Sequence, residues 1–435
     1  MGDPIMWQNA DHTVTLIDIP RSIACAQGHS MASSMALLST LPLDAPYPSN
    51  EPKSETAKAK LKGNNAEYEL HVEYGHILQK AIEEVKSGHP GDCCLPRECV
   101  EPSPRPAKKR RLDYTGSYSA PTDELDLPKN FLSNMARSRQ PAEEDITIIW
   151  PAETELPYAV EQSEASDPGS EGLTMCNPHR QTATLKLQTE SSAEPFTFYI
   201  PPKASFYLRD CTESKNLRNA VRQTAREQST RSAFDFIIFD PPWPNRSVKR
   251  THKTPGSTYA TSPSLEQLRD MMLDMKLDIL VEDGGLVSIW ITNKPAIRDF
   301  VLGDRGIFNC CNIELIEEWI WLKTTSKGEP VTQIDGLWRK PYEVLLVGRK
   351  KKKDEKLLGQ QHLAQNIKRR VIIGVPDLHS RKPCLKSLIE PMMRDSVNYR
   401  ALEVFARYLV AGWWSWGDEC IKYNWEGYWR QIEEG

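Results

Sequence analysis

The spacing of hydrophobic positions changes near residue 183. Beyond that point, short apolar or alternating runs typical of strands are separated by stretches whose apolar residues have helical spacing. Strands that alternate with helices in this way predict a doubly wound α/β domain with a largely parallel sheet. The predicted strands lie at 182–189, Phe196–Ile200, 204–208, Phe234–Phe239, 285–291, 317–322, 342–347, 371–375 and 402–405.

Two helices are predicted inside this α/β region. Ser264 and Gln267 have the spacing of a helix cap, and apolar residues with helical spacing follow them. Residues 384–393 have the pattern of a second helix.

The first 145 residues have weaker periodicity, and we expect them to be largely irregular. Residues 13–19 alternate like a short strand, and residues 74–85 place apolar side chains on one face of a helix that ends at Gly88. The pattern predicts an N-terminal region at 1–145, a β-rich linker at 146–195 and the α/β domain at 196–435.

Composition and charge limit the class of protein. Ten of the twelve tryptophans lie at or after Trp243, so we expect the main core in the second half of the 435 residues. The net charge is −4, so any affinity for nucleic acid must come from a local patch. Neither a run of 18 apolar residues nor a signal-peptide core is present, which predicts an intracellular protein that has no membrane partner.

The ten cysteines are scattered, which favours reduced thiols over a disulfide framework. His89, Cys93, Cys94 and Cys99 cluster in one stretch and are candidate zinc ligands. Because no CxxC pair is present there, free thiols in a loop are the better interpretation, and no metal site is predicted.

A block of four cations, Lys108-Lys109-Arg110-Arg111, lies in a segment rich in Pro and Ser. An exposed basic block of this kind is typical of a nuclear-localisation signal. It predicts a nuclear location and the nuclear import machinery as a partner. A solvated basic linker is the alternative.

Asp240-Pro241-Pro242-Trp243 directly follows the apolar strand Phe234–Phe239. Two prolines can extend neither a helix nor a central strand, so the chain must turn there in a fixed shape. The turn places a carboxylate, backbone carbonyls and a large aromatic ring at the carboxyl end of a strand, where α/β sheets bind ligands. A rigid turn without a chemical role is the alternative.

These groups suit the exocyclic amine of adenine, whose lone pair is delocalised into the ring. An enzyme that alkylates this nitrogen must hold both N–H groups with acceptors. Asp240 accepts one, the carbonyl of Asp240 or Pro241 accepts the other, and Trp243 stacks on the base. Most of the acceleration then comes from positioning. Asp240, Pro241, Pro242 and Trp243 are therefore the candidate catalytic residues.

Several further blocks extend this motif in a fixed order. Together with 240–243, the segments 283–293, 318–324, 340–343, 379–383 and 402–407 resemble the DPPW family of adenine-N6 methyltransferases, which use S-adenosylmethionine. Segments 247–250, 340–343 and 412–417 resemble its methyltransferase-like protein four branch. The resemblance covers about residues 196–430. It implies a Rossmann-like class I S-adenosylmethionine-dependent methyltransferase fold with permuted motif order, in which the catalytic strand precedes the usual first strand.

The resemblance also implies a cofactor site that includes Asp240. Asp210 and Cys211 match the position that holds the cofactor's adenine, and Lys382 matches a lysine near its methionine carboxylate. Glu403, on the late strand, is implied to meet the ribose, although a surface acid is equally consistent with the sequence. The remaining implied contacts are Arg407, and Asp418 with Glu419, which stand where relatives carry amide or mixed amide and acid side chains.

The loop after the catalytic turn carries the densest positive charge near the site. Its cations would neutralise phosphates beside a target adenosine, and Tyr259 would add a stacking face. A solvated surface loop is the alternative. The cations are Arg246, Lys249, Arg250, His252 and Lys253, with Lys323, Lys327, Arg339 and Lys340 as an extension.

A base inside a duplex cannot reach such a site, so the adenine must be single-stranded, looped or flipped out. The branch resembled implies RNA, such as a 2′-O-methylated adenosine of a small nuclear RNA, and DNA is the alternative. A non-catalytic nucleic-acid-binding subunit and a protein amide methyltransferase are further alternatives. Asp240 argues against both, and Trp243 against the second. A monomer fits the sequence, and a heterodimer stays open.

Overall fold

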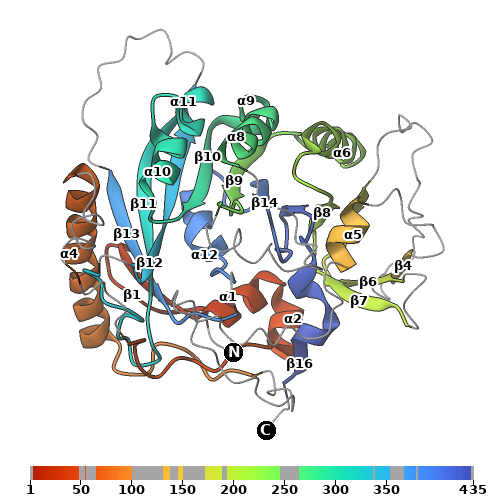
Figure 1. Ribbon diagram of the computed structural model, residues 1–435. Coiled ribbons are helices and arrows are strands. Elements are labelled where there is room, and N and C mark those ends of the chain that lie inside the picture. Colours follow the sequence, from red (N-terminus) through yellow and green to blue (C-terminus); the bar gives the residue numbers. More distant parts are fainter. Residues whose placement is uncertain are drawn as a thin grey trace.

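Figure 1 shows the computed structural model of the chain. The residues that it describes are 3–48, 54, 65–99, 131–137, 146–149, 172–188, 194–244, 264–336, 339–352, 367–378 and 381–432.

A mixed central sheet organises the described residues, with eleven strands in the order β1-β2-β13-β11-β12-β10-β9-β14-β15-β8-β5. Eight of these strands are parallel to one another, whereas β1, β12 and β5 are antiparallel to their neighbours. The predicted α/β fold is therefore confirmed. The strands span β1 Ile5–Gln8, β2 Val14–Ile17, β13 Lys368–Gly374, β11 Ile313–Lys323, β12 Tyr342–Lys350, β10 Val281–Ile291, β9 Phe234–Phe239, β14 Ala401–Val404, β15 Trp414–Gly417, β8 Ser205–Leu208 and β5 Leu173–Cys176.

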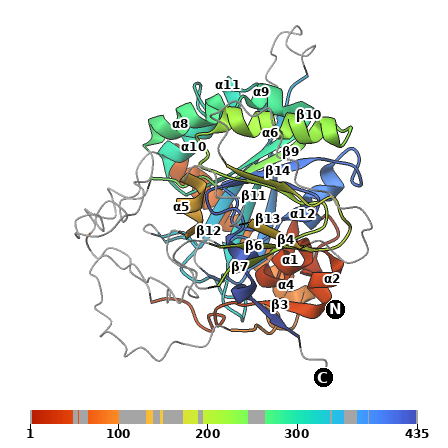
Figure 2. The same cartoon turned by 90° about the vertical axis from the view of Figure 1, so that its right-hand side faces the viewer.

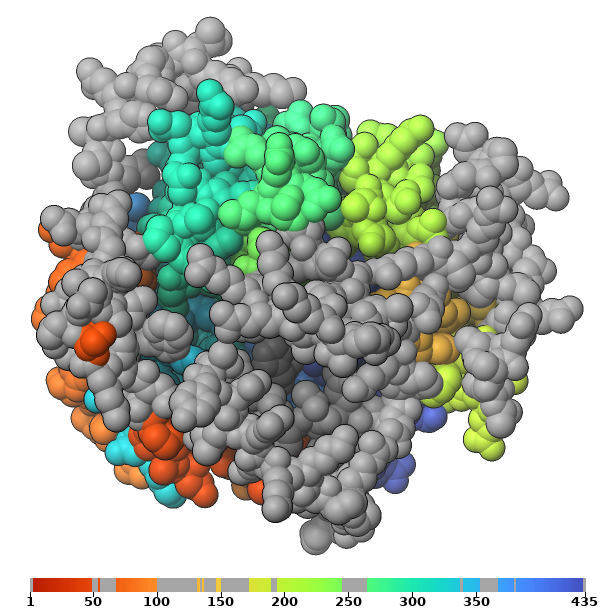
Figure 3. All heavy atoms as spheres, in the orientation of Figure 1, coloured from red at the N-terminus to blue at the C-terminus, as the bar shows by residue number. Residues whose placement is uncertain are grey.

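Helices cover both faces of this sheet. Alternate residues of β9 point to opposite faces, so Ile237 and Phe239 belong to one core and Phe236 and Ile238 to the other. Several helices of the first core lie side by side on the surface in Figure 3. The first core includes α4 (Asn65–Gly88), α6 (Ser214–Glu227), α8 (Leu265–Asp274), α9 (Leu277–Leu280), α10 (Pro295–Leu302) and α11 (Ile307–Cys310); the second includes α1 (Ile19–Ala26), α2 (His29–Ser34) and α12 (Lys386–Ile389).

A third core lies beside the central sheet. The antiparallel strands β4 (Ile146–Ile149), β6 (Ala183–Leu187) and β7 (Phe196–Ile200) pack with α5 (Phe131–Arg137), and Figure 2 shows this small sheet from the front. The shorter elements are β3 (Met35–Leu37) and β16 (Trp429–Gln431), which pair with each other, and the 3-10 helices η3 (Glu390–Met392), η4 (Lys422–Asn424) and η5 (Glu426–Tyr428).

Of the two helices predicted in the α/β region, one has the expected cap and the other is shorter than expected. Ser264 accepts a hydrogen bond from the backbone N–H of Gln267, and the Gln267 side chain accepts one from the N–H of Ser264, so the predicted cap of α8 is confirmed. The helix expected over 384–393 is wrong in extent. It forms only as α12 and then tightens into η3, where Pro391 has no backbone N–H to continue an α-helix.

The N-terminal segments differ from the predicted division at residues 145 and 195. β2 lies within the short strand predicted at residues 13–19; it pairs in parallel with β13 and is buried at all four positions, and β1 adds a further strand beside it. α4 packs the predicted apolar face, which includes Tyr74 and Leu78, into the first core. Residues before 100 thus complete the same sheet as the C-terminal half, because β13 would otherwise be an exposed edge.

A buried carboxylate holds α4 to this sheet. Glu318 of β11 is fully buried and accepts hydrogen bonds from Tyr74 of α4 (2.9 Å), from Arg369 of β13 (2.9 Å) and from Arg298 of α10. Burial alone would raise the pKa of Glu318, but Arg298 and the three hydrogen bonds hold it below its usual value. Four elements therefore converge on one charge.

The described part of the chain contains neither a metal-binding cluster nor a membrane-spanning helix. No group of three or more His, Cys, Asp or Glu side chains there is arranged to hold a metal ion. All ten cysteines are free thiols, and Cys93 and Cys94 are buried. None of the described helices has both the length and the apolar character that a membrane span requires.

Candidate active site

The Asp240–Trp243 turn lies at a switch point of the sheet. β9 and β14 are neighbours, and from their carboxyl ends the chain leads to opposite sides, to β10 from β9 and to β15 from β14. Phe239 pairs with Val404 at these ends. Ligands of open α/β sheets bind in the crevice outside such a switch point. β14 is the late strand of the predicted permuted order, and it lies directly beside the catalytic strand.

The Asp240–Trp243 turn is held by backbone and side-chain contacts. The N–H of Trp243 donates to the carbonyl of Pro241 (2.8 Å), which leaves that carbonyl one lone pair for another donor. The indole N–H of Trp243 donates to the carbonyl of Trp290 (2.8 Å), and its ring meets Phe300 edge-on. The ring that we expect to stack on a base is thus fixed at two points, and its stacking role stays a prediction.

A lysine and two carboxylates meet beside this turn. The ammonium of Lys382 lies 3.0 Å from Asp240 Oδ1 and 3.2 Å from Glu343 Oε2, and Lys323 pairs with Glu343 from the other side. Burial alone would raise the pKa of Glu343, but Lys323 and Lys382 hold it far below its usual value. Burial would lower the pKa of Lys382, but Asp240 and Glu343 raise it overall. Glu343 and Lys382 are therefore both charged at neutral pH.

Glu343 lies in the segment 340–343 that carries the family resemblance, but the sequence predicted no role for it. The sign in the sequence is an acid at the second position of a buried strand that begins directly after Pro341. The lining residues Trp290 and Trp413 were missed because a buried strand tryptophan has the same pattern whether it faces the core or a pocket.

A recess lies between the turn and β14 and is lined by residues of both. It brings together the predicted residues Asp240, Lys382, Glu403 and Arg407. The pKa of Glu403 is raised to about 8, first by burial and then by nearby Asp240, while Lys382 acts in the opposite direction. The wall thus offers charges of both signs and one carboxyl that is easily protonated.

The other predicted cofactor residues lie along the same edge of the sheet, outside the walls of this recess. Asp210 and Cys211 follow the end of β8, and Asp418 and Glu419 follow the end of β15. Asp210 accepts hydrogen bonds from the backbone N–H and the hydroxyl of Thr212, whereas Cys211 is buried, which raises the pKa of its thiol well above its usual value.

Asp418 and Glu419 already have protein partners. Asp418 accepts a hydrogen bond from Ser133 (3.3 Å), and Glu419 pairs with Arg407 (3.6 Å) and Lys422 (3.1 Å). Their cofactor roles stay predictions, as does that of Arg407.

Most of the predicted nucleic-acid contacts lie outside the described residues. These are Arg246, Lys249, Arg250, His252, Lys253 and Tyr259. Of the proposed extension, Lys323 pairs with Glu343 and lies over the Trp321 ring, and Lys327 pairs with Asp92 (2.7 Å).

Glu403→Gln is expected to flatten the pH dependence of stability. The raised pKa of Glu403 means that the folded protein keeps a proton which the unfolded chain releases near pH 4.5. Stability from this proton is fully present below that pH and is lost as the pH rises through about 8. Urea denaturation at a series of pH values should show a fall of up to about 1.4 kcal/mol per pH unit in the wild type that the amide variant lacks. Parallel profiles of stability against pH for the wild type and Glu403→Gln would contradict the raised pKa of Glu403.

Comparison with known proteins agrees with the geometry. Residues 234–419 match the MT-A70 family. An N6-methyladenosine RNA methyltransferase of Cryphonectria parasitica is 35% identical over 290 residues, which cover 63% of this chain and 79% of that protein. A human N(6)-adenine-specific methyltransferase is 31% identical, over 55% of this chain and 46% of its own length. A DNA N6-methyl methyltransferase of Caenorhabditis elegans is 28% identical, over 67% of this chain and 72% of its own length.

The matched segment begins with β9 and contains the Asp240 turn, Lys382 and Glu403, so all of the recess lining except Tyr423 lies within it. The resemblance to adenine-N6 methyltransferases is confirmed. The chain belongs to the MT-A70 family and is an adenine-N6 methyltransferase.

Proposed function

We propose that this chain transfers the methyl group of S-adenosylmethionine to N6 of an adenine in RNA. The observation that carries the proposal is the placement of the Asp240 turn and the charged recess side by side at the carboxyl ends of β9 and β14. RNA is favoured because the relative named for RNA is 35% identical and the relative named for DNA is 28% identical.

The residues of the recess fit this cofactor. Its ribose hydroxyls and its amine need acceptors, which Glu403 and Asp240 offer. Its carboxylate needs cationic donors, which the same wall offers in Lys382 and Arg407. When bound, S-adenosylmethionine supplies an electrophilic methyl group.

The chain's own residues then act by holding the adenine amine. Asp240 accepts one N–H of the amine, and the remaining lone pair of the Pro241 carbonyl accepts the other, so electron density stays on the nitrogen. Trp243, anchored by Trp290 and Phe300, gives the base a surface at a fixed angle. Lys382 is shared by Asp240 and Glu343, and this pairing holds the Asp240 carboxylate in place.

Matched RNA and DNA oligonucleotides test the substrate. The full chain is incubated with methyl-labelled S-adenosylmethionine and single strands of one sequence as RNA, as RNA with a 2′-O-methylated adenosine, and as DNA. Nucleoside mass spectrometry should find N6-methyladenosine in an RNA strand at a rate well above that for DNA. Faster methylation of the DNA strand would replace RNA by DNA in the proposal, and no transfer to any strand would overturn it.

Lys249→Glu combined with Arg250→Glu is expected to weaken RNA binding by at least tenfold at low salt, because both charges are reversed in the loop that follows the catalytic turn. Binding is measured by fluorescence anisotropy at two salt concentrations. Lys186→Glu, on the small sheet, is the control for a surface charge reversal. Equal RNA affinities of the wild type and the loop variant would show that the loop does not contribute to RNA binding.

We also propose that Lys108-Lys109-Arg110-Arg111, outside the described residues, directs the protein to the nucleus. Replacing the four residues by alanine should leave a fluorescent fusion of the full chain in the cytoplasm. Wild-type nuclear accumulation of that variant would contradict the proposal.

A further inference from the structure

The outer surface of α6 carries a row of four cations. They lie three or four residues apart, so their side chains project from one side of the helix over about 16 Å. On the other side of α6, Leu217 and Val221 are packed in the first core. Asn219 lies within the row, whereas Glu227 lies outside it. The α6 row consists of Lys215, Arg222 and Arg226, which are exposed, and Arg218, which is half-buried.

The α6 row opposes the stability of the helix that carries it. The amino end of a helix has a partial positive charge that favours acids, yet the first turn of α6 contains Lys215 and no acidic residue. Arg218 with Arg222, and Arg222 with Arg226, are like charges four residues apart, which destabilise a helix. Only Arg226, in the last turn, has a charge that suits its end of the helix. Helix stability therefore does not explain the row.

One member of the row has a partner in the fold. Arg218 donates to the backbone carbonyl of Asp274 at the end of α8 (2.7 Å). Burial lowers the pKa of Arg218 and nearby Arg222 lowers it further, while Asp274 and Asp278 act in the opposite direction. The other three members form no ion pair or side-chain hydrogen bond with the described residues.

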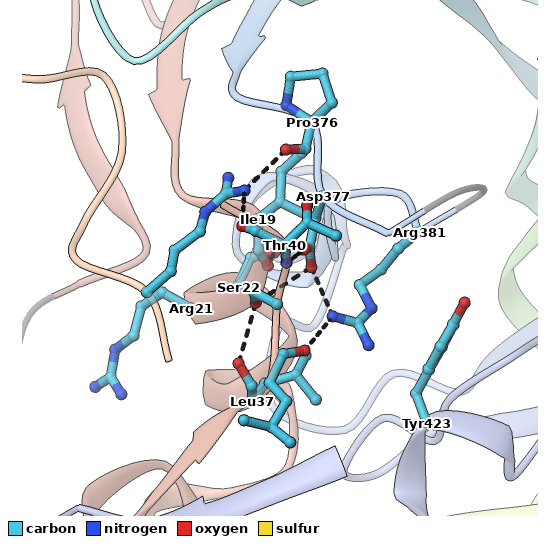
Figure 4. Close-up of polar contacts among 12 residues, drawn as sticks. Ile19, Arg21, Ser22, Leu37, Thr40, Pro376, Asp377, Arg381 and Tyr423 are labelled. Atoms are coloured by element: carbon cyan, nitrogen blue, oxygen red, sulfur yellow. Dashed lines mark hydrogen bonds and ion pairs between the residues drawn. The ribbon is translucent and has the colours of Figure 1, made fainter. Parts of the chain in front are cut away.

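Cations that hold segments of this fold together have acceptors. Arg381 donates to Asp377 (2.6 Å) in the interior, and Figure 4 shows this pair between segments that are far apart in the sequence. At the surface, Arg231 pairs with Asp235 and Glu282. The three unpartnered cations of the α6 row do not serve the fold in this way, so their charge is available to an anionic partner.

The α6 row begins at the edge of the sheet that holds the recess. β8, β15, β14 and β9 are parallel neighbours, so their carboxyl ends share one edge. α6 leads from the carboxyl end of β8 back to the amino end of β9, and Figure 2 shows it lengthwise. Lys215 therefore lies nearest the edge of the recess, and Arg226 lies farthest from it.

A nucleic-acid strand has the charge that complements this surface. The chain is an adenine-N6 methyltransferase with a net charge of −4, so a local cationic patch must attract its polyanionic substrate. One strand of a duplex carries a charge about every 3.4 Å along the axis, so a row of about 16 Å faces several phosphates. A strand whose adenine enters the recess can continue over α6, because the row starts at the same edge.

We propose that the α6 row binds backbone phosphates of the substrate RNA outside the nucleotide that is methylated. This rests on the proposed use of RNA. The Asp240 turn then holds the adenine, and α6 holds the backbone several nucleotides away. Contacts to phosphates carry no base information, so the α6 row adds affinity for longer RNA without adding sequence preference.

Arg222→Gln combined with Arg226→Gln tests the α6 row. Fluorescence anisotropy measures binding of the full chain to a short RNA that carries the target adenosine and to the same RNA extended in either direction, over a range of salt concentrations. We expect the variant to bind extended RNA about tenfold more weakly at low salt. The salt slope of log K should become shallower by about 1.4, since two phosphate contacts to a single strand are lost. Affinity for the short RNA should fall by less than about twofold, because its phosphates do not reach the end of the row.

Two controls separate this contact from bulk charge and from damage to the fold. Lys80→Gln combined with Lys86→Gln removes two exposed charges from α4, which packs beside β2 and β13 at the other end of the sheet. It should leave the affinity for extended RNA within about twofold of the wild type. In thermal unfolding, the α6 variant should be as stable as the wild type, because it removes two like-charge pairs and no partner within the described fold.

The outcomes are distinct. Equal affinity of the wild type and the α6 variant for extended RNA would overturn the inference in favour of another anionic partner. An equal loss for short and extended RNA, or the same loss in the α4 control, would overturn it as well. Failure of the wild type to methylate any RNA would instead overturn the proposed function.

Discussion

Asp240→Ala is expected to lower methyl transfer to adenine by about a thousandfold or more while the fold stays intact, from the size of effects seen when one preorganised polar contact to the reacting group is removed. The variant removes the carboxylate that holds the amine. Lys382 keeps its contact with Glu343, so no buried charge is left alone. Single-turnover transfer to an RNA oligonucleotide measures the effect, and thermal unfolding checks the fold.

Asp235→Ala is the matched control, since it removes an acid from the opposite end of the same strand. Asp235 pairs with Arg231 at the surface (2.8 Å), far from the recess. The activity of Asp235→Ala should stay within about threefold of the wild type, because Asp235 touches no group of the site.

Asp240→Asn keeps the shape of the side chain and one acceptor oxygen, so we expect an activity between those of Asp240→Ala and the wild type. Turnover by Asp240→Ala within tenfold of the wild type would contradict the catalytic role of Asp240.

Glu318→Ala is expected to lower the free energy of unfolding by about 3–5 kcal/mol, the usual cost of removing one member of a buried ion pair. Arg298, Arg369 and Tyr74 would lose their common acceptor, and α4 would lose its polar anchor on the sheet. Urea denaturation measures the loss. Hydrogen exchange should show faster opening of α4 than of β9, since α4, like α10, is held to the sheet by this contact and β9 takes no part in it.

Glu282→Ala serves as the control for loss of an exposed ion pair. Glu282 meets Arg231 at 3.3 Å, and both side chains are at least a third exposed, so its removal should cost less than about 1 kcal/mol. A loss below 1 kcal/mol for Glu318→Ala as well would show that the buried network contributes no more to stability than a surface pair.

Much of the site could be predicted from local sequence. The apolar strand Phe234–Phe239 followed by two prolines placed Asp240 at the carboxyl end of a strand, because proline excludes a continued helix or strand whatever the surroundings. The family resemblance added Lys382, Glu403 and Arg407, and the structure brings these three together with Asp240 around one recess. The basic loop that follows the turn stays a prediction.

The sequence by itself determined the strands, the rigid turn and the order of the motifs, since hydrophobic periodicity and proline geometry act over neighbouring residues. Only the tertiary structure decided that β2 completes the sheet and that Glu343 shares Lys382 with Asp240. These features depend on which distant segments meet and on how far water is excluded between them. Burial and pairing set the charge state of each group, and neither is encoded in the spacing of residues along the chain.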